Sequence, residues 1–572
     1  MLKTKFGIYF FNFFYISLLS IGPYLLTRFI NHDKEVYIVS FCYYFLLISF
    51  NRFLKKSPLD VFKKINHVTD KFGNKFYIFL IFIILIINQN NLLNYETISW
   101  DTASYLVAST PISDGFLPLE KQWDSKGPLF FYIYYILNFL SNNTLVYFKI
   151  LNDAILLLIS LNLFKTLNLF NKDNKFISFI FTTLFLTITA KADFVPEYSE
   201  YYVLLIVAWV FVRYLRHGFG GNNLYIIPFS ISFCFLINQS AIIFLIPYIF
   251  LYLRDSKFKL NEVTKTLLGF FIPQLFIHVV YYINGIYDLL LINYYHVPFG
   301  YSAVGNDSSL NELRIWFREY YHFNKFTYFS LITVVYFQLN KYLDSYREKN
   351  FNIEINLLSL HVVVSLLIYF IGGHNYAHHL IYFVYFMVLI LGRLKLNNFQ
   401  IVVILIVFLS SSSVFIKSFN QSFYNLTNVK TVQESYPIYQ LAQNIKGTQI
   451  GNNYSVLALE YVLVLYYLEK ENYSYIVHPT NHFENYIADP LIQFGYIENN
   501  QINKLFKEEP DIILCNSIRI HEGSPIENSN FDCSQENFIN YYQIDTSLIR
   551  KNRKIEYFFD PYKELNVFIK NN

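Results

Sequence analysis

Long apolar runs recur along this 572-residue chain as far as residue 416, and they constrain its fold more than any other feature. A helix of about 20 apolar residues crosses a bilayer core of about 30 Å, and fewer suffice where a helix end is buried in protein. The chain is 54% hydrophobic and only 15% charged, whereas soluble domains carry about 25% charge. We therefore expect a mostly α-helical, polytopic membrane protein. Thirteen candidate transmembrane helices lie at residues 7–28, 36–50, 76–93, 144–164, 176–190, 200–215, 224–237, 240–253, 266–283, 326–340, 356–371, 377–392 and 399–416.

The basic residues predict how these helices are oriented. Lys and Arg accumulate in cytoplasmic loops, and successive spans place successive loops on alternating sides. The loops on the same side as the N-terminus hold 23 Lys and Arg, whereas the loops on the opposite side hold 7. This asymmetry predicts a cytoplasmic N-terminus and, after an odd number of spans, an outer location for everything beyond residue 416.

Two apolar segments need a separate interpretation. Residues 128–140 are too few to span and are followed by polar residues, so we expect an interfacial helix there. The run 224–253 is interrupted by Asn238 and Gln239. We read it as two short helices because a single helix would move the basic segment 254–265 to the outer side.

The composition changes near residue 420, where polar residues become frequent and no later run could cross a bilayer. We divide the chain into a membrane domain, 1–419, and a small soluble α/β outer domain, 420–572. Helical spacing at 436–446 and 460–469 and strand-like runs at 454–458 and 511–515 suggest this class. Cys515 and Cys533 are the only cysteines of the outer domain. We expect that they can pair in an oxidising compartment, with two unpaired thiols as the alternative.

The charge pattern also excludes some functions. The net charge is +4, and the basic residues form short clusters between apolar runs. Such clusters set membrane orientation and give no nucleic-acid footprint. The sequence contains no C-x-x-C pair with metal-ligand spacing.

The first outer loop, residues 94–143, carries the most informative motif. It reads W-D-x-A-x-Y from Trp100 to Tyr105 and later W-D-x-K-G-P from Trp123, which includes Lys126. Asp101 follows a span directly, so it lies where a base must sit if the substrate is a lipid phosphate whose sugar projects outward. The alternative is a solvated loop acid beside an interfacial Trp.

In its order and spacing this loop resembles the first periplasmic loop of a known family. W-D-x-A-x-Y, then D-G-F-L-P, then W-D-x-K-G-P-L-F-F-Y are similar to lipid-linked-sugar glycosyltransferases of the C-type fold, which include protein O-mannosyltransferases and aminoarabinose transferases. The resemblance implies that Asp101 is the catalytic base. Many relatives have a second acid directly after it, where Thr102 stands here.

Further elements follow in the family's order over most of residues 76–416. Glu200 resembles an acid that opens a later span, and Gln239 lies in a stretch where relatives have Lys-Gln but this chain has Asn238-Gln239. His374 and His378 fall in a segment similar to an outer G-G-R-x-x-x-H-Y loop, with His374 in the Arg position. The tail at 509–513 is similar to the outer domain of bacterial members.

The resemblance implies a donor, an acceptor and a location. The donor would be a sugar linked to a polyprenyl phosphate, and the acceptor a cell-surface glycan, lipid or protein. The enzyme would be a multi-pass protein of the bacterial inner membrane with its C-terminal domain in the periplasm. The reaction would be an inverting single displacement.

This chemistry assigns roles to the candidate residues. An attacking hydroxyl needs a base, for which Asp101 is suited. The departing phosphate needs cationic or hydrogen-bonding groups. Candidates for binding substrate or phosphate are Lys126, His374, His378, Gln239 and Tyr105. Glu197 and Glu200 could orient the acceptor or hold a divalent metal ion, and no other cofactor is expected.

These residues also have plain structural explanations. Lys126 could be a snorkelling lysine, the histidines could be interfacial side chains, and an acid such as Glu200 is favoured at a helix N-terminus by the dipole. The rival functional classes are a secondary transporter and a polysaccharide flippase or polymerase. A transporter commonly shows inverted repeats and acids near the bilayer midplane, whereas the notable carboxylates here lie in predicted outer loops.

The charge asymmetry leads to a topological prediction. A reporter enzyme that works only outside the cytoplasm should be active when it is fused after residue 420. A paired reporter that works only in the cytoplasm should stay silent at the same position. A cytoplasmic signal would overturn the predicted orientation and the outer location of Asp101.

Overall fold

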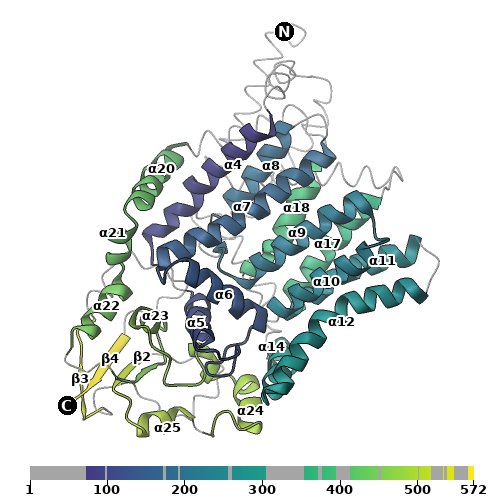
Figure 1. Cartoon of the computed structure of the whole chain (residues 1–572). Coiled ribbons are helices and arrows are strands. Elements are labelled where there is room, and N and C mark those ends of the chain that lie inside the picture. The colour runs from purple at the N-terminus through teal and green to yellow at the C-terminus, as the bar shows by residue number, and fades with distance from the viewer. Residues whose placement is uncertain are drawn as a thin grey trace, which may run out of the picture.

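The computed structural model describes residues 73–96, 99–171, 175–190, 194–255, 260–304, 353–371, 377–393, 412–448, 453–499, 501–516, 533, 538–546 and 565–571. Most of these residues are helical, and a small sheet lies near the C-terminus. Figure 1 shows the helices slanting side by side through one body, with the strands at one end of it. The mostly α-helical class expected from the sequence is confirmed.

Nine of the thirteen predicted spans coincide with described helices. They are α4 (Asn74–Gln89), α7 (Leu145–Phe170), α8 (Lys175–Ile188), α9 (Ser199–His217), α10 (Asn223–Ile237), α11 (Ile246–Asp255) with the 3-10 helix η4 (Gln239–Leu245) before it, α12 (Leu260–Ile283), α17 (Ile353–Ile371) and α18 (Ile381–Arg393) with η6 (Ala377–Leu380) before it. The spans 7–28, 36–50 and 326–340 lie outside the described residues, as does most of 399–416.

Three described segments are long and apolar enough to cross a membrane, namely Asn74–Asn94, Leu145–Phe170 and Leu260–Ile283. The number thirteen is therefore not confirmed. Several of the other apolar helices are shorter than a bilayer requires, among them α8 and α10. Membrane association itself is supported by the three long helices.

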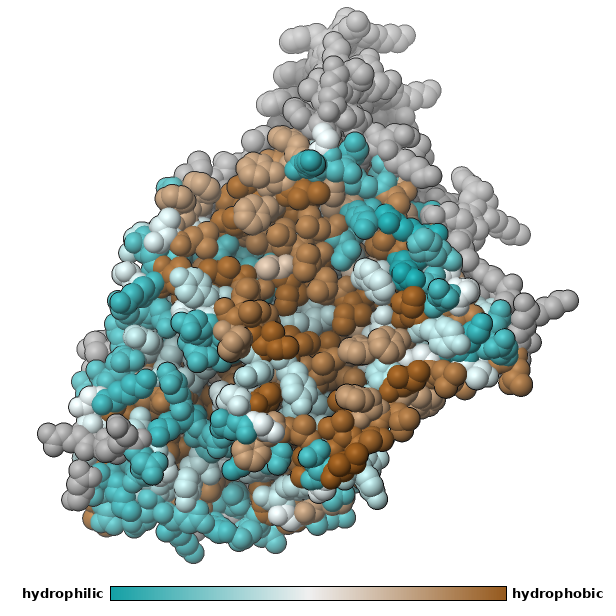
Figure 2. Space-filling model, in the orientation of Figure 1, coloured by the Kyte–Doolittle hydropathy of each residue, from teal (hydrophilic) through white to brown (hydrophobic). Residues whose placement is uncertain are grey.

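The surface of these helices is also apolar. Large hydrophobic side chains are exposed along α4, α10, α12 and α17, including Phe79, Phe229, Phe276 and Val363. Figure 2 shows the hydrophobic residues gathered over the helices and along α12, whereas hydrophilic residues cover the C-terminal end of the molecule. Exposed apolar area on this scale is typical of a surface that contacts lipid or another protein.

The predicted outer loop 94–143 is itself folded. After the short helix η1 (Asn90–Asn94) it forms α5 (Trp100–Ala108), η2 (Thr110–Asp114) and α6 (Pro128–Leu140), and the last has the bounds expected for the interfacial helix. The loop before α6 packs tightly on the end of α10. A Cβ atom on Gly127 would lie 2.0 Å from the carbonyl oxygen of Leu236, so only glycine fits there. This close approach places Lys126 beside Asn238, where the chain turns a corner between α10 and the next helix (the Asn238 corner).

The helix break predicted at Asn238 and Gln239 is confirmed. Asn238 has an extended backbone conformation, and its side-chain oxygen accepts a hydrogen bond from the backbone N–H of Ser240. This capping satisfies an N–H group that would otherwise lack a partner at the start of η4. The break turns the polar Asn238 and Gln239 side chains out of the helical register between α10 and α11.

A connection of short helices follows α12. It comprises α13 (Tyr287–Leu291), the π-helical turn η5 (Ile292–His296) and α14 (Val297–Val304). Its amide side chain Asn293 donates to the backbone oxygen of Lys126. The connection therefore fastens the Lys126 loop, and it also packs on α10 through the stacked rings of Tyr294 and Phe235.

The C-terminal part begins with α20 (Ser412–Thr427), α21 (Val429–Glu434) and α22 (Pro437–Lys446) and ends in a four-stranded sheet. The strand order is β1-β2-β4-β3, with β1 (Val456–Ala458) parallel to β2 (Ile512–Asn516) and the β2–β4 and β4–β3 pairs antiparallel. The other elements are α23 (Leu463–Leu468), η7 (Pro479–His482), α24 (Asn485–Gln493), α25 (Gln501–Lys507), β3 (Tyr541–Gln543) and β4 (Leu565–Lys570). The α/β character predicted for this part is confirmed, with α22, α23, β1 and β2 at the expected places.

The C-terminal part packs directly on the helices. Buried side chains of both parts, such as Leu106 and Leu465, belong to one continuous hydrophobic core, and α23 packs on α5. The buried carboxylate of Glu96 accepts the backbone N–H groups of Ile438 and Tyr439 at 2.6 and 3.1 Å, which caps the start of α22. Burial raises the pKa of Glu96 to about 7.

The structure joins Cys515 on β2 to Cys533 by a disulfide, with Cα atoms 5.9 Å apart. This geometry agrees with the predicted pairing. A bridge over 18 positions of sequence stabilises a fold by about 3 kcal/mol, mainly by restricting the unfolded chain.

We predict that denatured, unreduced protein will react with a maleimide only at Cys42 and Cys234, and that prior reduction will add two labelled sites. Mass spectrometry of the labelled peptides provides the measurement. Replacing Cys515 and Cys533 together by serine should lower the free energy of unfolding by about 3 kcal/mol. Labelling of both cysteines before reduction would show that the bridge does not form.

Candidate active site

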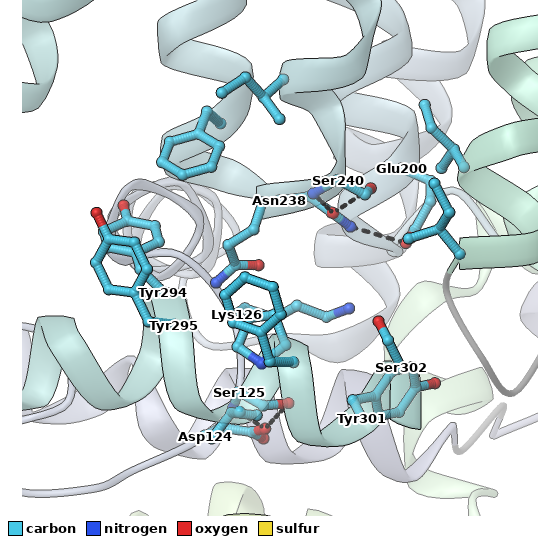
Figure 3. A pocket seen from close by; sticks show the side chains of 18 of the residues that line it. Asp124, Ser125, Lys126, Glu200, Asn238, Ser240, Tyr294, Tyr295, Tyr301 and Ser302 are labelled. Carbon is cyan, nitrogen blue, oxygen red and sulfur yellow. Dashed lines mark hydrogen bonds between the residues drawn. The ribbon is translucent and has the colours of Figure 1, made fainter. Parts of the chain in front are cut away.

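A cavity of about 1130 Å³ lies between the helices and the C-terminal part. Its polar end is formed by α5, the 124–126 loop, the start of α9 and η7, whereas apolar side chains of α10, α12, α14 and α17 form the rest of the wall. Figure 3 shows Lys126 reaching into this space between the Asn238 corner and Asp124. Six predicted site residues line the cavity: Asp101, Tyr105, Lys126, Glu200, Gln239 and His378.

Helix α5 presents Asp101 and Tyr105 on one face because residues four positions apart lie on successive turns of the same side of a helix. Asp101 lies in the first turn of α5, where the helix dipole favours a negative charge. Its side chain is 31% exposed, so the carboxylate contacts the cavity. Tyr105 is buried against Phe130 with ring centroids 4.9 Å apart.

Asp101 is held by a histidine from the C-terminal part. Its Oδ1 atom lies 2.8 Å from Nε2 of His478. Burial alone would raise the pKa of Asp101, but the His478 hydrogen bond and the charge of Lys126 outweigh it. The pKa of Asp101 is therefore well below its ordinary value, and the group is ionised at neutral pH.

Lys126 provides a cation at the polar end of the cavity. Its ammonium lies over the ring of Tyr105, 5.8 Å from the centroid. The same charge acts on Asp101 and, more strongly than any other charged group, on Glu200. Lys126 is thus close enough to both Asp101 and Glu200 to act on two of the carboxylates that line the cavity.

Glu200 lies in the first turn of α9 and is buried. The Asn238 amide donates to its Oε1 atom at 3.0 Å and also to Ser199, so the helix break described above orients this carboxylate. The Oε1 atom is 3.6 Å from Nε2 of His379. His378 stacks on the ring of Tyr198 with a centroid separation of 4.0 Å.

Glu200, His378 and His379 offer ligand atoms that all lie within 4.8 Å of one another. Two imidazoles and a carboxylate are a donor set that suits zinc and other divalent transition metals. The Lys126 charge acts on the same group of residues, which favours an anion there over a cation. If a divalent ion is bound, as considered above for Glu197 and Glu200, the residues that would hold it are Glu200, His378 and His379.

Glu197 is placed elsewhere. It is buried and is not among the residues that line the cavity, and its electrostatic partners are Lys149 and Asp153 on α7. The reason is the extended backbone of Tyr198 ahead of α9, which directs the two glutamates to different sides. His374 lies outside the described residues.

Gln239 lines the cavity, and its amide donates to the backbone oxygen of Asn293 at 3.1 Å. This bond joins the break after α10 to the π-helical turn. Gln239 therefore shapes the cavity wall, and its side-chain oxygen is the atom left for a ligand.

Sequence reasoning missed four residues of the site: Asp124, His379, Asn238 as a partner of Glu200, and His478. Asp124 lies in the W-D-x-K-G-P motif and His379 adjoins His378, so proximity to the chosen residues was a usable signal. His478 follows Asp101 by 377 positions. The sequence offered no sign that this histidine would reach the first loop.

Asp124 differs from Asp101 in its environment. It is almost fully buried, its Oδ1 atom accepts from the backbone N–H of Ser125 at 2.6 Å and from Asn481 at 3.3 Å, and its Oδ2 atom has no hydrogen bond among the described residues. Burial raises the pKa of Asp124 to about 6. The cavity thus combines one ionised carboxylate with a second that holds a proton more tightly.

Neither a scan against models of known protein families nor a search of curated proteins finds a match to this chain.

The raised pKa of Asp124 predicts a pH-dependent effect of substitution. Because its folded pKa exceeds the unfolded value of about 3.9, the contribution of Asp124 to stability falls as pH rises from about 4 to about 6 and then levels off. Asp124→Asn cannot ionise and should escape that loss. Relative to wild type it should gain up to about 3 kcal/mol between about pH 4 and pH 7.5, measured by thermal unfolding in detergent.

The matched control is Asp114→Asn, because Asp114 is exposed in the same loop. Asp114→Asn should melt close to wild type. An Asp124→Asn difference that stays constant with pH would contradict the assigned environment.

Proposed function

We propose that this chain is an integral-membrane glycosyltransferase that moves a sugar from a polyprenyl phosphate to an acceptor hydroxyl on the outer face of the membrane. One observation carries the proposal: a single cavity joins a long apolar wall to a polar end with the ionised Asp101 and the cation Lys126. A lipid-linked sugar phosphate requires this combination. The acceptor would be a cell-surface glycan, a lipid or a protein.

The apolar wall gives a lipid substrate a way in. Phe271 and Leu275 of α12 line the cavity and are also 56% and 64% exposed on the apolar surface of the molecule. A polyprenyl chain could therefore enter beside α12 without leaving an apolar environment. Burying such a chain is favourable at about 25 cal/mol per Å² of apolar surface.

The polar end suits the chemistry of sugar transfer. The acceptor oxygen would attack the anomeric carbon while its proton passes to the carboxylate of Asp101. The bond between the anomeric carbon and the phosphate oxygen would break, and its electron pair would leave with the polyprenyl phosphate. A single displacement of this kind inverts the anomeric configuration.

The leaving phosphate gains charge as that bond breaks, so it needs fixed donors. Lys126 and His378 line the cavity and can supply charge-assisted hydrogen bonds, and His379 lies beside them. Glu200 would hold His379 and balance the cationic groups before substrate binds. If the reaction uses a divalent ion, the ion would neutralise phosphate charge, and Glu200, His378 and His379 would hold it.

Three observations from the sequence support the same function. The motif order resembles lipid-linked-sugar glycosyltransferases, the charge asymmetry predicts that Asp101 faces outward, and Asp101 follows a span directly. Secondary transport and polysaccharide flipping remain the alternatives, and neither needs an ionised carboxylate as base. Release of free polyprenyl phosphate from a sugar-linked carrier distinguishes the transferase from both.

We predict that Asp101→Asn will insert normally, still bind the lipid carrier and transfer almost no sugar. The change keeps the size of the side chain but removes the base, which typically costs about 100-fold to 10,000-fold in rate. The assay is release of polyprenyl phosphate by purified protein from a panel of polyprenyl-phosphate-linked hexoses and pentoses.

Asp114→Asn is the control because Asp114 lies in the same loop, is exposed and does not line the cavity. It should retain wild-type activity. Full activity of Asp101→Asn would refute the assigned base and direct attention to Glu200.

A further inference from the structure

The proton positions on His478 can be assigned from its surroundings. Its Nδ1 atom lies 3.3 Å from the backbone nitrogen of Thr480, and a backbone N–H can only donate. Nδ1 therefore accepts, as it also does from the Thr480 hydroxyl at 2.8 Å. The neutral ring then carries its proton on Nε2 and donates it to Oδ1 of Asp101.

This arrangement treats the two oxygens of Asp101 differently. Oδ1 is occupied by His478, whereas Oδ2 accepts no hydrogen bond that fixes it among the described residues. The side chain keeps part of its surface in the cavity. Oδ2 is thus the oxygen left to take a proton from an acceptor.

His478 is itself held rigidly. It is buried, and the ring of Trp100 meets it edge-on with centroids 6.5 Å apart. Tyr475 and Val477 precede His478 in the chain. Their backbones pair with the backbone of Trp123 through hydrogen bonds of 2.8 and 3.1 Å.

The same strand-like contact is fixed by the buried amide of Gln122, which donates to the backbone oxygens of Asn472 and Ser474. This pairing sets the register of the C-terminal part against the first loop. A slip would carry His478 away from α5.

We infer that His478 is the positioning residue of the catalytic base: it fixes Asp101 with one oxygen open to the acceptor, so the C-terminal part completes the active site. The inference rests on the proposed function only for the identity of the reaction. The charged and titratable groups that act on Asp101 are Tyr105, Asp124, Lys126, His378, His379 and His478. Asp124 and Glu484 act on His478 in turn.

The contact can be tested without any substrate. We would measure the thermal unfolding of wild type, Asp101→Asn, His478→Ala and the double variant in detergent. Residues that interact directly give non-additive effects, whereas distant ones add. We expect the double variant to melt well above the temperature that the sum of the two single shifts predicts. Additive shifts would overturn the pairing whatever the reaction is.

The positioning role can be told apart from a purely structural role by the pH dependence of activity. Removing the His478 donor should raise the pKa of Asp101 and shift the acid limb of the kcat/KM profile upward by about one pH unit or more. At a pH below the shifted limb, His478→Ala should therefore lose about 10-fold more of its alkaline activity than wild type loses of its own. His478→Gln keeps an N–H donor and should restore most of the wild-type profile.

His296→Ala is the control, because His296 is exposed and does not line the cavity. It should leave both the melting temperature and the pH profile unchanged. An active His478→Ala with an unshifted acid limb would overturn the inference while leaving the transferase proposal intact. Conversely, non-additive melting without any sugar release by wild type would sustain the contact and refute the transferase.

Discussion

The hydrogen bond from His478 to Asp101 joins two segments that are far apart in the chain, and much of the site's order is organised around it. For the bond to form, α5 must project Asp101 toward the cavity, and the segment before η7 must lie in register along the first loop. That register depends on the Trp123 backbone and the Gln122 amide. The first loop and the C-terminal part therefore reach their native arrangement only together.

The same cavity separates its charges in a way that suits group transfer. One carboxylate, Asp101, is kept ionised by a donor and by nearby cations, and another, Asp124, is driven toward its neutral form by burial. Environments that make the pKa values of two acids differ are a common way to assign different proton-transfer tasks to chemically similar groups. Lys126 acts on both Asp101 and Glu200, so the attraction of each carboxylate helps to hold an ammonium that water would otherwise solvate.

Much of the local structure could be predicted from the sequence because it depends on local patterns. The apolar segment 128–140 forms a helix with the predicted bounds, and Asn238 ends α10 because its polar side chain caps the next turn. Strand β2 (Ile512–Asn516), predicted at 511–515, likewise follows from a short apolar run. In these cases the residues that decide the outcome are neighbours in sequence.

The parts that could not be predicted depend on distant contacts or on small rotations. No pattern in the sequence relates His478 to Asp101, because the contact exists only after Trp123 pairs with its distant partner strand. Glu197 and Glu200 are three positions apart and would share a helix face, but α9 begins only at Ser199. Glu200 therefore enters the cavity and Glu197 does not. Composition alone could not establish the number of spans, since several of the described apolar helices are shorter than a bilayer requires.

The side chains of Phe271 and Leu275, which belong at once to the cavity wall and to the outer apolar surface, have a kinetic consequence. A substrate that arrives past them diffuses in two dimensions within the lipid. The quantity that saturates such a site is the mole fraction of substrate in the membrane, not its concentration in the bulk volume. Adding inert lipid or detergent would then slow the reaction at constant total substrate, because it dilutes the surface from which the site is filled.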